Sequence, residues 1–158
     1  MPRVYVSIGS NVEPEKQVRF AVSSLRQFFG DLIESPVYRT NAIGFKGPDF
    51  LNMVVAFDSG QSAEQIHDRL NSIERESGRL KSDKQFASRT LDLDMLLYGN
   101  EVIDSLRIPR DEIARYAFVL KPLCDISPEL LHPVSQKSMC ELWEDFDLNG
   151  QELKAVQI

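Results

Sequence analysis

The sequence has few of the features that several common classes of protein require. It contains only two cysteines, Cys124 and Cys140, with no CxxC pair and no zinc-ligand spacing. One disulfide stays possible, but two reduced thiols are favoured. No apolar run approaches the roughly 20 residues that cross a bilayer, and the run at 4–8 is too short for a signal-peptide core. We therefore expect a cytoplasmic protein.

An excess of positive charge is also missing. The formal net charge is −6, which argues against a nucleic-acid-binding surface or a basic helix on a membrane. The chain lacks the Gly-x-x-x-x-Gly-Lys-Ser/Thr loop that cradles phosphates. A local group of cations could still hold a nucleotide with its magnesium. Basic residues gather in two central stretches: Arg75, Arg79, Lys81, Lys84 and Arg89, then Arg107, Arg110 and Arg115.

The hydrophobic pattern predicts alternating strands and helices in a single domain over residues 1–158. Pro36 falls inside one predicted strand and favours an edge position or a bulge there. Ser62 and Gln65 form a capping box, and Gly30 and Gly78 are expected to end the helices. The predicted strands are 4–8, 32–38, 50–58 and 91–98, the helices are 13–29 and 62–78, and shorter elements lie around 111–116, 118–122 and 138–145.

The order of these elements, β-α-β-β-α-β, is that of a ferredoxin-like domain. It predicts an α+β fold in which both helices pack on one face of an antiparallel sheet, followed by short C-terminal elements. The topology alone does not identify an activity, because it hosts many unrelated functions.

Two carboxylates stand two positions apart on the last predicted strand. Asp92 and Asp94 therefore project from the same face. Carboxylates this close repel each other unless a cation lies between them, and Mg²⁺ typically binds one or two carboxylates plus substrate phosphates. An isolated Asp-x-Asp pattern is better explained by a half-solvated strand, so a metal site depends on the surrounding residues.

Those residues resemble a known signature. Segment 87–96, ASRTLDLDML, closely resembles that of the 6-hydroxymethyl-7,8-dihydropterin pyrophosphokinases: two small residues, an arginine, two further residues, then Asp-aliphatic-Asp and two aliphatics. The resemblance extends in order over nearly the whole chain, through segments 6–11, 38–52, 73–79, 97–103 and 117–130.

The resemblance implies a magnesium-dependent transferase of folate biosynthesis. Such an enzyme moves a diphosphate from ATP to the hydroxymethyl group of the pterin and releases AMP, and its chemistry is mostly positioning and electrostatics. Asp92 and Asp94 would hold two Mg²⁺ ions and would act in catalysis with Arg79 and Arg89. The nucleotide-binding positions would include Arg79, Lys81, Arg89 and Glu74, although Glu74 is almost as well explained as a carboxylate on a helix surface.

A pterin requires stacking surfaces and a hydrogen-bonding edge. Phe50 and Phe118 match the stacking aromatics of the family, and the Asn52 amide both donates and accepts. Core packing explains most phenylalanines, and a turn at a strand end is the alternative for Asn52. The pterin-binding positions implied by the resemblance are Thr40, Ile43, Phe50, Asn52, Phe86 and Phe118.

Several positions depart from the family pattern: Phe86 replaces a common tryptophan, Ser88 a proline, Arg110 a histidine and Tyr116 an arginine. One hypothesis is that Arg110 or Arg115 supplies the missing contact with the ATP phosphates. A solvated surface network with Asp111 and Glu112 explains these two arginines equally well.

Two other functions stay open on the sequence alone. One is a non-catalytic module that binds a pterin or a nucleotide, and the other is an ordinary kinase that transfers only the γ-phosphate. We expect small-molecule substrates and a monomer, with no nucleic-acid or membrane partner.

Overall fold

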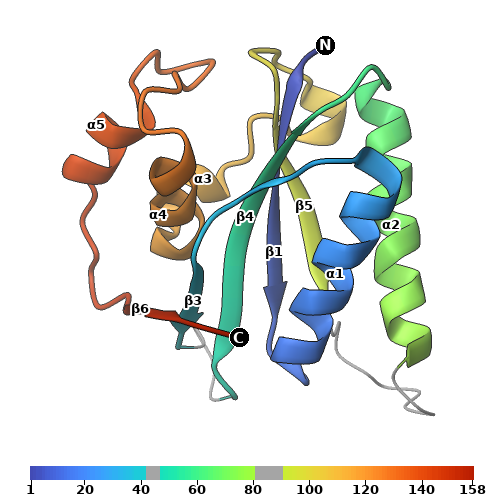
Figure 1. The fold of residues 1–158 in the computed structure, drawn as a ribbon. Coiled ribbons are helices and arrows are strands. Elements are labelled where there is room, and N and C mark those ends of the chain that lie inside the picture. Colours follow the sequence, from blue (N-terminus) through green and yellow to red (C-terminus); the bar gives the residue numbers. More distant parts are fainter. Residues whose placement is uncertain (42–46, 81–90) are drawn as a thin grey trace.

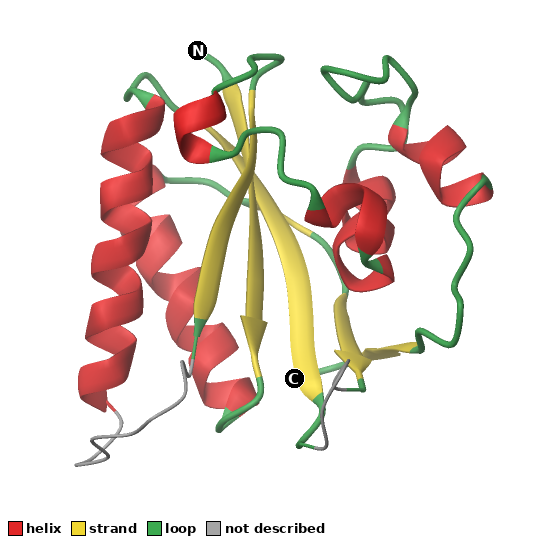
Figure 2. Ribbon diagram, turned by 180° about the vertical axis from the view of Figure 1, so that it is seen from behind, coloured by secondary structure: helices red, strands yellow, loops and turns green. Residues whose placement is uncertain are grey.

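The computed structural model describes residues 1–41, 47–80 and 91–158, with the backbone alone for residues 79 and 80. A central sheet separates two layers of helices (Figures 1 and 2). In chain order the elements are β1 (Arg3–Ser10), α1 (Pro14–Phe29), β2 (Ile33–Glu34), β3 (Val37–Thr40), β4 (Phe50–Asp58), α2 (Ala63–Leu80), β5 (Asp92–Tyr98), the 3-10 helix η1 (Asp104–Leu106), α3 (Glu112–Arg115), α4 (Ala117–Ile126), α5 (Met139–Glu144) and β6 (Leu153–Val156).

The sheet has the strand order β5-β1-β4-β3-β6, with the short strand β2 also pairing with β4. Every pairing in it is antiparallel. Helices α1 and α2 cover one face, and α3, α4 and α5 lie on the other (Figure 1). The predicted α+β, ferredoxin-like arrangement is therefore confirmed, with β6 as an additional strand beyond β3.

Alternating side chains of the strands supply a separate core on each face of the sheet. Val6 and Ile8 of β1 pack with Leu25 of α1 and Leu70 of α2. On the other face, Tyr5, Val54 and Leu97 pack with Leu120 and Leu123 of α4. Because both faces of the sheet are covered, its central strands are buried, and a polar side chain on them must face a cavity or a partner.

An irregularity in β5 decides how its side chains are shared between the two faces. The register with β1 shifts between Tyr5 and Val6, so Leu96 has no direct partner in β1. Leu96 and its neighbour Leu97 both join the core beneath α4. On the other side of this bulge, Leu93 and Met95 face the helices α1 and α2.

Three predicted boundaries were wrong. The predicted strand 32–38 is divided at Pro36, where Ser35 replaces the regular pairing by donating its N–H to the Val54 carbonyl and accepting the Val54 N–H on Oγ, both at 2.9 Å. Gly78 does not end α2, which continues to Leu80. The first strand continues through Gly9 to Ser10, because both residues pair with β4.

The predicted N-terminal cap of α2 was confirmed. Ser62 and Gln65 form the expected reciprocal capping box, with N···O distances of 3.0 and 3.1 Å. Cys124 and Cys140 are both free thiols. Within the described parts of the chain, no helix combines the length and apolar character that crossing a membrane requires.

Candidate active site

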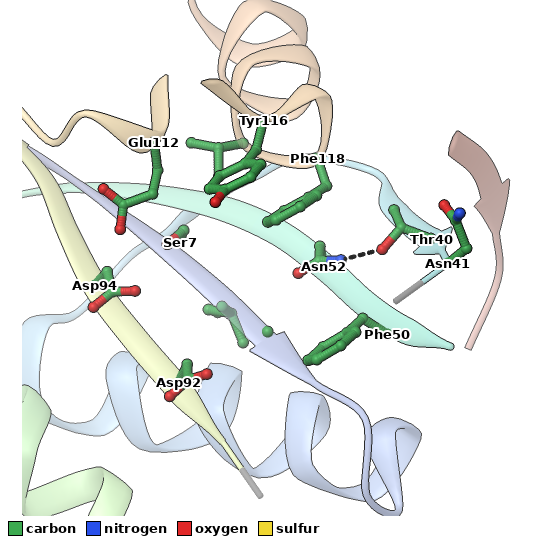
Figure 3. Close-up of a pocket in the computed structure, with 13 residues that line it drawn as sticks. Ser7, Thr40, Asn41, Phe50, Asn52, Asp92, Asp94, Glu112, Tyr116 and Phe118 are labelled. Carbon is green, nitrogen blue, oxygen red and sulfur yellow. Dashed lines mark hydrogen bonds between the residues drawn. The ribbon is translucent and has the colours of Figure 1, made fainter. Parts of the chain in front are cut away.

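A cavity of about 280 Å³ opens beside the sheet on the face that carries α3 and α4. It collects residues from four strands and two helices, which are far apart in the sequence (Figure 3). The lining residues are Ser7, Ile8, Gly9, Thr40, Asn41, Phe50, Asn52, Asp92, Asp94, Glu112, Tyr116, Phe118 and Val119.

The register of the sheet sets the floor of this cavity. Gly9 of β1 pairs with Asn52 of β4 on one side and with Asp92 of β5 on the other. A Cβ atom at Gly9 would lie 2.8 Å from Asn52 Oδ1, closer than real contacts of this kind. Because glycine has no side chain, Gly9 leaves the space that the Asn52 amide occupies. The importance of this pairing was not predicted from the sequence.

Asn52 is buried, and its orientation is fixed by a neighbour. Its Nδ2 atom donates a hydrogen bond of 2.8 Å to Thr40 Oγ1 of β3. This contact turns the amide so that Oδ1 lies on the Gly9 side, beside the cavity. Thr40 and Asn52 therefore form one hydrogen-bonded polar pair at the cavity floor. Asn52 lies within β4, so the alternative of a turn at a strand end was wrong.

Aromatic rings lie around this polar pair. Phe50 and Phe118, from β4 and α4, lie on either side of Asn52 (Figure 3). The Tyr116 ring lies nearly parallel to that of Phe118, with centroids 5.0 Å apart and an interplanar angle of 13°. A slot with rings on its walls and an amide at its floor suits a flat polar heterocycle.

The two aspartates lie in the same cavity, along β5 from the aromatic slot. Asp92 and Asp94 point toward the same space (Figure 3), as the strand spacing predicted. Their hard oxygen atoms suit Mg²⁺, which commonly combines one or two carboxylates with substrate phosphates. Within the described residues, no group of three or more His, Cys, Asp and Glu forms a ready metal site. Two carboxylates that face one cavity fit a Mg²⁺ ion that also binds the phosphates of a ligand.

Among the residues that the structure describes, Arg110 is a cation close to Asp94. Its Nη2 atom lies 2.5 Å from Glu112 Oε2 and 3.7 Å from Asp94 Oδ1, and 17% of its side chain is exposed. Its Nε atom is buried and makes no hydrogen bond to any described residue. The expected pairing with Glu112 is present, but it is half-buried beside the site instead of solvated at the surface.

The contact between Arg110 and Glu112 keeps both groups charged. Burial by itself would raise the pKa of Glu112, but the hydrogen bond from Arg110 and the charges of Arg110 and Arg107 together lower it. Burial likewise opposes the charge of Arg110, while Glu112 and Asp94 outweigh it and raise the pKa of the guanidinium. A half-buried anion and cation are thus held in their charged forms next to Asp94.

Arg115 lies in a different environment. It is exposed, and its guanidinium carbon lies 5.4 Å from the centroid of the Tyr116 ring. A smaller cavity of about 180 Å³ lies there, lined by Arg107, Asp111, Glu112, Arg115 and Tyr116. Because Glu112 and Tyr116 also line the main cavity, the two spaces adjoin.

Glu74 contacts β5 from the opposite side of the sheet. Its Oε2 atom accepts a hydrogen bond of 2.7 Å from the backbone N–H of Leu93, the residue between the two aspartates. The structure thus gives Glu74 a role in holding the strand. Other predicted site residues lie outside the described parts of the chain, namely Ile43, Lys81, Phe86 and Arg89, while Arg79 belongs to the last turn of α2.

Comparisons with known proteins agree with this geometry. A family model described as 7,8-dihydro-6-hydroxymethylpterin-pyrophosphokinase matches residues 5–128. The 2-amino-4-hydroxy-6-hydroxymethyldihydropteridine pyrophosphokinase of Pseudomonas aeruginosa is 37% identical over 137 residues, which cover 83% of this chain and 84% of that protein. The folic acid synthesis protein fol1 of Pneumocystis carinii is 36% identical over 149 residues, which cover 89% of this chain but 20% of that larger protein.

Solved structures show the same fold. The HPPK-DHPS of Plasmodium falciparum superposes with a TM-score of 0.73 over 90% of this chain, at 11% identity. The match covers 45% of that structure's chain, so this chain spans less than half of it.

Proposed function

The chain belongs to the 7,8-dihydro-6-hydroxymethylpterin-pyrophosphokinase family, and on that premise we propose that it transfers a diphosphate from ATP to 6-hydroxymethyl-7,8-dihydropterin. The products are AMP and the pterin diphosphate, and the reaction serves folate biosynthesis. The observation that carries this proposal is a single cavity that joins an aromatic slot with an amide floor to a pair of carboxylates. One end suits a pterin, and the other suits a metal and phosphates.

The pterin ring would stack between Phe50 and Phe118. Its amide-like edge would meet Asn52, whose Oδ1 is left free to accept because Nδ2 donates to Thr40. Ile43 and Phe86 complete the proposed pterin-binding set by their resemblance to family positions. This orientation directs the hydroxymethyl substituent along β5 toward Asp92 and Asp94.

Asp92 and Asp94 would hold Mg²⁺, and two ions are proposed from the family resemblance. When bound there, Mg²⁺ would supply positive charge that offsets the charge of the phosphates and lowers the pKa of the attacking alcohol. The hydroxymethyl oxygen attacks the β-phosphorus, and the bond between that phosphorus and the bridging oxygen of the α-phosphate breaks as AMP leaves. The chain's own residues contribute mostly by positioning and by fixed charge.

The proposed nucleotide-binding residues come from two stretches. Arg79, Lys81 and Arg89 match family positions, and we assign them to the phosphates, with Arg79 and Arg89 acting in catalysis. Arg115 is a candidate for a further phosphate contact, since it is exposed beside the cavity that adjoins the main one. Arg110 would act on the phosphates from beside Asp94. Glu74, also assigned to this site, would act by holding β5 in place.

The nucleotide product tests this proposal. The protein is incubated with Mg-ATP and the hydroxymethyl-dihydropterin, and the nucleotides are separated by ion-exchange chromatography. Pterin-dependent AMP supports the proposed reaction. ADP would show an ordinary kinase, and the absence of turnover would favour a binding module; either result contradicts the proposal.

We further propose that the chain acts as a monomer in the cytoplasm. The solved relatives named above are longer chains, so the assembly of this protein requires its own measurement. Light scattering should give the mass of one chain, and a larger mass at micromolar concentration would contradict the monomer.

A further inference from the structure

The C-terminal segment returns to the active-site face after α5. In Figure 1 it leaves α5, runs beside α4 and ends in β6 next to β3. The family model stops at residue 128, so this segment lies beyond the matched part of the chain. It nevertheless contacts elements on both sides of the main cavity.

Gln151 makes the contact with the helical side. Its Oε1 atom accepts a hydrogen bond of 2.8 Å from the backbone N–H of Ala117, and its Nε2 atom donates one of 3.1 Å to the backbone carbonyl of Arg115. Ala117 is the first residue of α4, and Arg115 is the last of α3. Backbone groups at helix ends lack partners within their own helix, so one amide satisfies an end of each helix.

The residue between these two bonds is Tyr116, which connects the helices in an extended conformation, with φ −123° and ψ 124°. Its ring stacks on Phe118, and both rings line the main cavity. The Gln151 amide therefore fixes the backbone on either side of the aromatic wall.

The apolar contacts of the C-terminal part with the helices come from Leu142 and Phe146, which pack against the core beneath α4. An open cavity of about 440 Å³ lies between the C-terminal segment and the helices, and Arg115, Leu120, Leu142, Phe146 and Gln151 are among its lining residues. Gln151 lies beside this space, away from those apolar contacts, and its two hydrogen bonds join the segment directly to the junction of α3 and α4.

The same segment is anchored to the other wall of the site. Directly after Gln151 and Glu152, β6 pairs with β3, with Leu153 opposite Thr40 and Ala155 opposite Tyr38. Thr40 is the residue that orients the Asn52 amide. The short stretch 151–156 thus connects β3, which carries Thr40, to the junction of α3 and α4, which carries Tyr116.

We propose that Gln151 is a positioning residue that sets the aromatic wall, Tyr116 and Phe118, at its distance from the floor formed by Asn52 and Thr40. That the ligand is a pterin rests on the proposed function. The width of the slot between the aromatic wall and the floor would then decide how tightly the flat pterin ring is bound. Gln151 acts through the backbone and does not touch the ligand, so its loss should weaken the pterin site more than the nucleotide site, to which the neighbouring Arg115 is proposed to contribute.

Gln151→Met tests this, since methionine has nearly the same shape but neither hydrogen-bonding group. Isothermal titration with the hydroxymethyl-pterin should show Kd raised about fivefold to thirtyfold, equivalent to about 1–2 kcal/mol. Binding of a non-hydrolysable ATP analogue should weaken by a smaller factor than pterin binding. Gln151→Glu keeps an acceptor for the Ala117 N–H and should recover part of the affinity.

The matched control is Gln136→Met. Gln136 also donates its amide to a backbone carbonyl, that of Pro133 at 2.9 Å, in a turn outside the cavity. It should leave pterin binding at the wild-type value. If Gln136→Met weakens pterin binding as much as Gln151→Met, or if Gln151→Met weakens both ligands equally, Gln151 only stabilises the fold and the proposal is overturned.

A measurement without ligand separates this proposal from the proposed function. Amide hydrogen exchange reports local opening, and Gln151→Met should speed exchange over residues 116–120 while Gln136→Met does not. Unchanged exchange over 116–120 would overturn the positioning role even if the wild type forms AMP. Faster exchange over 116–120 in Gln151→Met, found together with a wild type that forms no AMP, would uphold the positioning role and reject only the reaction.

Discussion

At the scale of single residues, the cavity floor depends on a glycine, which has no side chain. Gly9 sits between Asn52 and Asp92 in the sheet, and any Cβ there would meet Asn52 Oδ1 at 2.8 Å. The clashing atom is the end of a side chain, so an alanine would displace the Asn52 amide instead of distorting the backbone. The pterin-binding role proposed for Asn52 therefore depends on Gly9, its neighbour on the adjacent strand β1.

Asn52→Ala should weaken pterin binding by about 1–3 kcal/mol, because a polar ligand edge is left unpaired, or about fivefold to 150-fold. Gly9→Ala should reproduce most of this loss although Asn52 is still present. The double variant should be little worse than either single one, since both remove the same contact. Isothermal titration with pterin checks this, with an ATP analogue as the control ligand. Additive losses would show that Gly9 and Asn52 act separately.

Asp92→Asn and Asp94→Asn should each reduce turnover by several orders of magnitude while the circular dichroism spectrum stays unchanged. The reason is that an amide is a much poorer Mg²⁺ ligand than a carboxylate and does not balance its charge. AMP formation at saturating substrates measures the effect. Near-wild-type turnover of Asp94→Asn at ordinary Mg²⁺ concentration would contradict the metal site, and a large loss of melting temperature without Mg²⁺ would point to a structural role.

At the scale of elements, α3 and the residues just before it carry two arginines with different surroundings. Arg110 is half-buried against Glu112 and Asp94, whereas Arg115 is exposed beside the adjoining cavity. Arg115→Ala should weaken binding of Mg-ATP about tenfold, with an effect that shrinks as salt is raised. Arg110→Ala should in addition lower the melting temperature, because Glu112 is left as a half-buried, unpaired charge.

One result with these two variants would contradict a role of either arginine in nucleotide binding. If neither raises the Kd for Mg-ATP more than about twofold, an effect below roughly 0.5 kcal/mol, both arginines serve only the structure. The phosphates would then depend on Arg79, Lys81, Arg89 and the metal.

The pair formed by Arg110 and Glu112 also makes a prediction about pH. The folded-state pKa of Glu112 lies below its ordinary value of 4.5, so its stabilising contribution is complete above that pH and disappears as pH falls through the lowered pKa. Urea unfolding of the metal-free protein should therefore show wild type more stable than Glu112→Gln at pH 7. The difference should shrink at acidic pH. A difference that stays constant down to pH 3 would contradict this account.

The elements that the sequence predicted well are those with a strong period and a large buried face. The order of strands and helices through β5 followed from such patterns, and the paired aspartates followed from the strand period. Strand β6 was missed because its four residues are half-buried or exposed and alternate only weakly. Pro36 was recognised as disruptive, but the local pattern did not reveal that Ser35 would replace the pairing and divide the strand.

The site was predicted only in part for a related reason. Thr40, Phe50, Asn52, Asp92, Asp94 and Phe118 converge on one cavity as the resemblance implied. Ser7, Glu112 and Tyr116 also line it but were not predicted as site residues. Their place depends on β1 lying between β4 and β5 and on the docking of α4, which are long-range pairings that no local pattern contains.

At the scale of the whole molecule, the antiparallel sheet and the helices across it bring the two chemical requirements of the reaction together. β4 and α4 provide the walls of a slot for a flat ring, and β5 carries the two carboxylates along the same cavity (Figure 3). The C-terminal segment connects the two sides of the slot through Gln151 and β6. The proposed pterin site and the proposed metal site therefore lie side by side because of the strand order.

The most direct test is a crystal structure of the protein with Mg²⁺, a non-hydrolysable ATP analogue and the hydroxymethyl-pterin. The pterin ring should lie between Phe50 and Phe118 with its edge on Asn52. Mg²⁺ should lie at about 2.0–2.1 Å from oxygen atoms of Asp92 and Asp94, the usual Mg–O distance. It should also contact the β-phosphate, which should lie next to the hydroxymethyl oxygen. A pterin outside this slot, or a metal that is not bound by these two aspartates, would contradict the account.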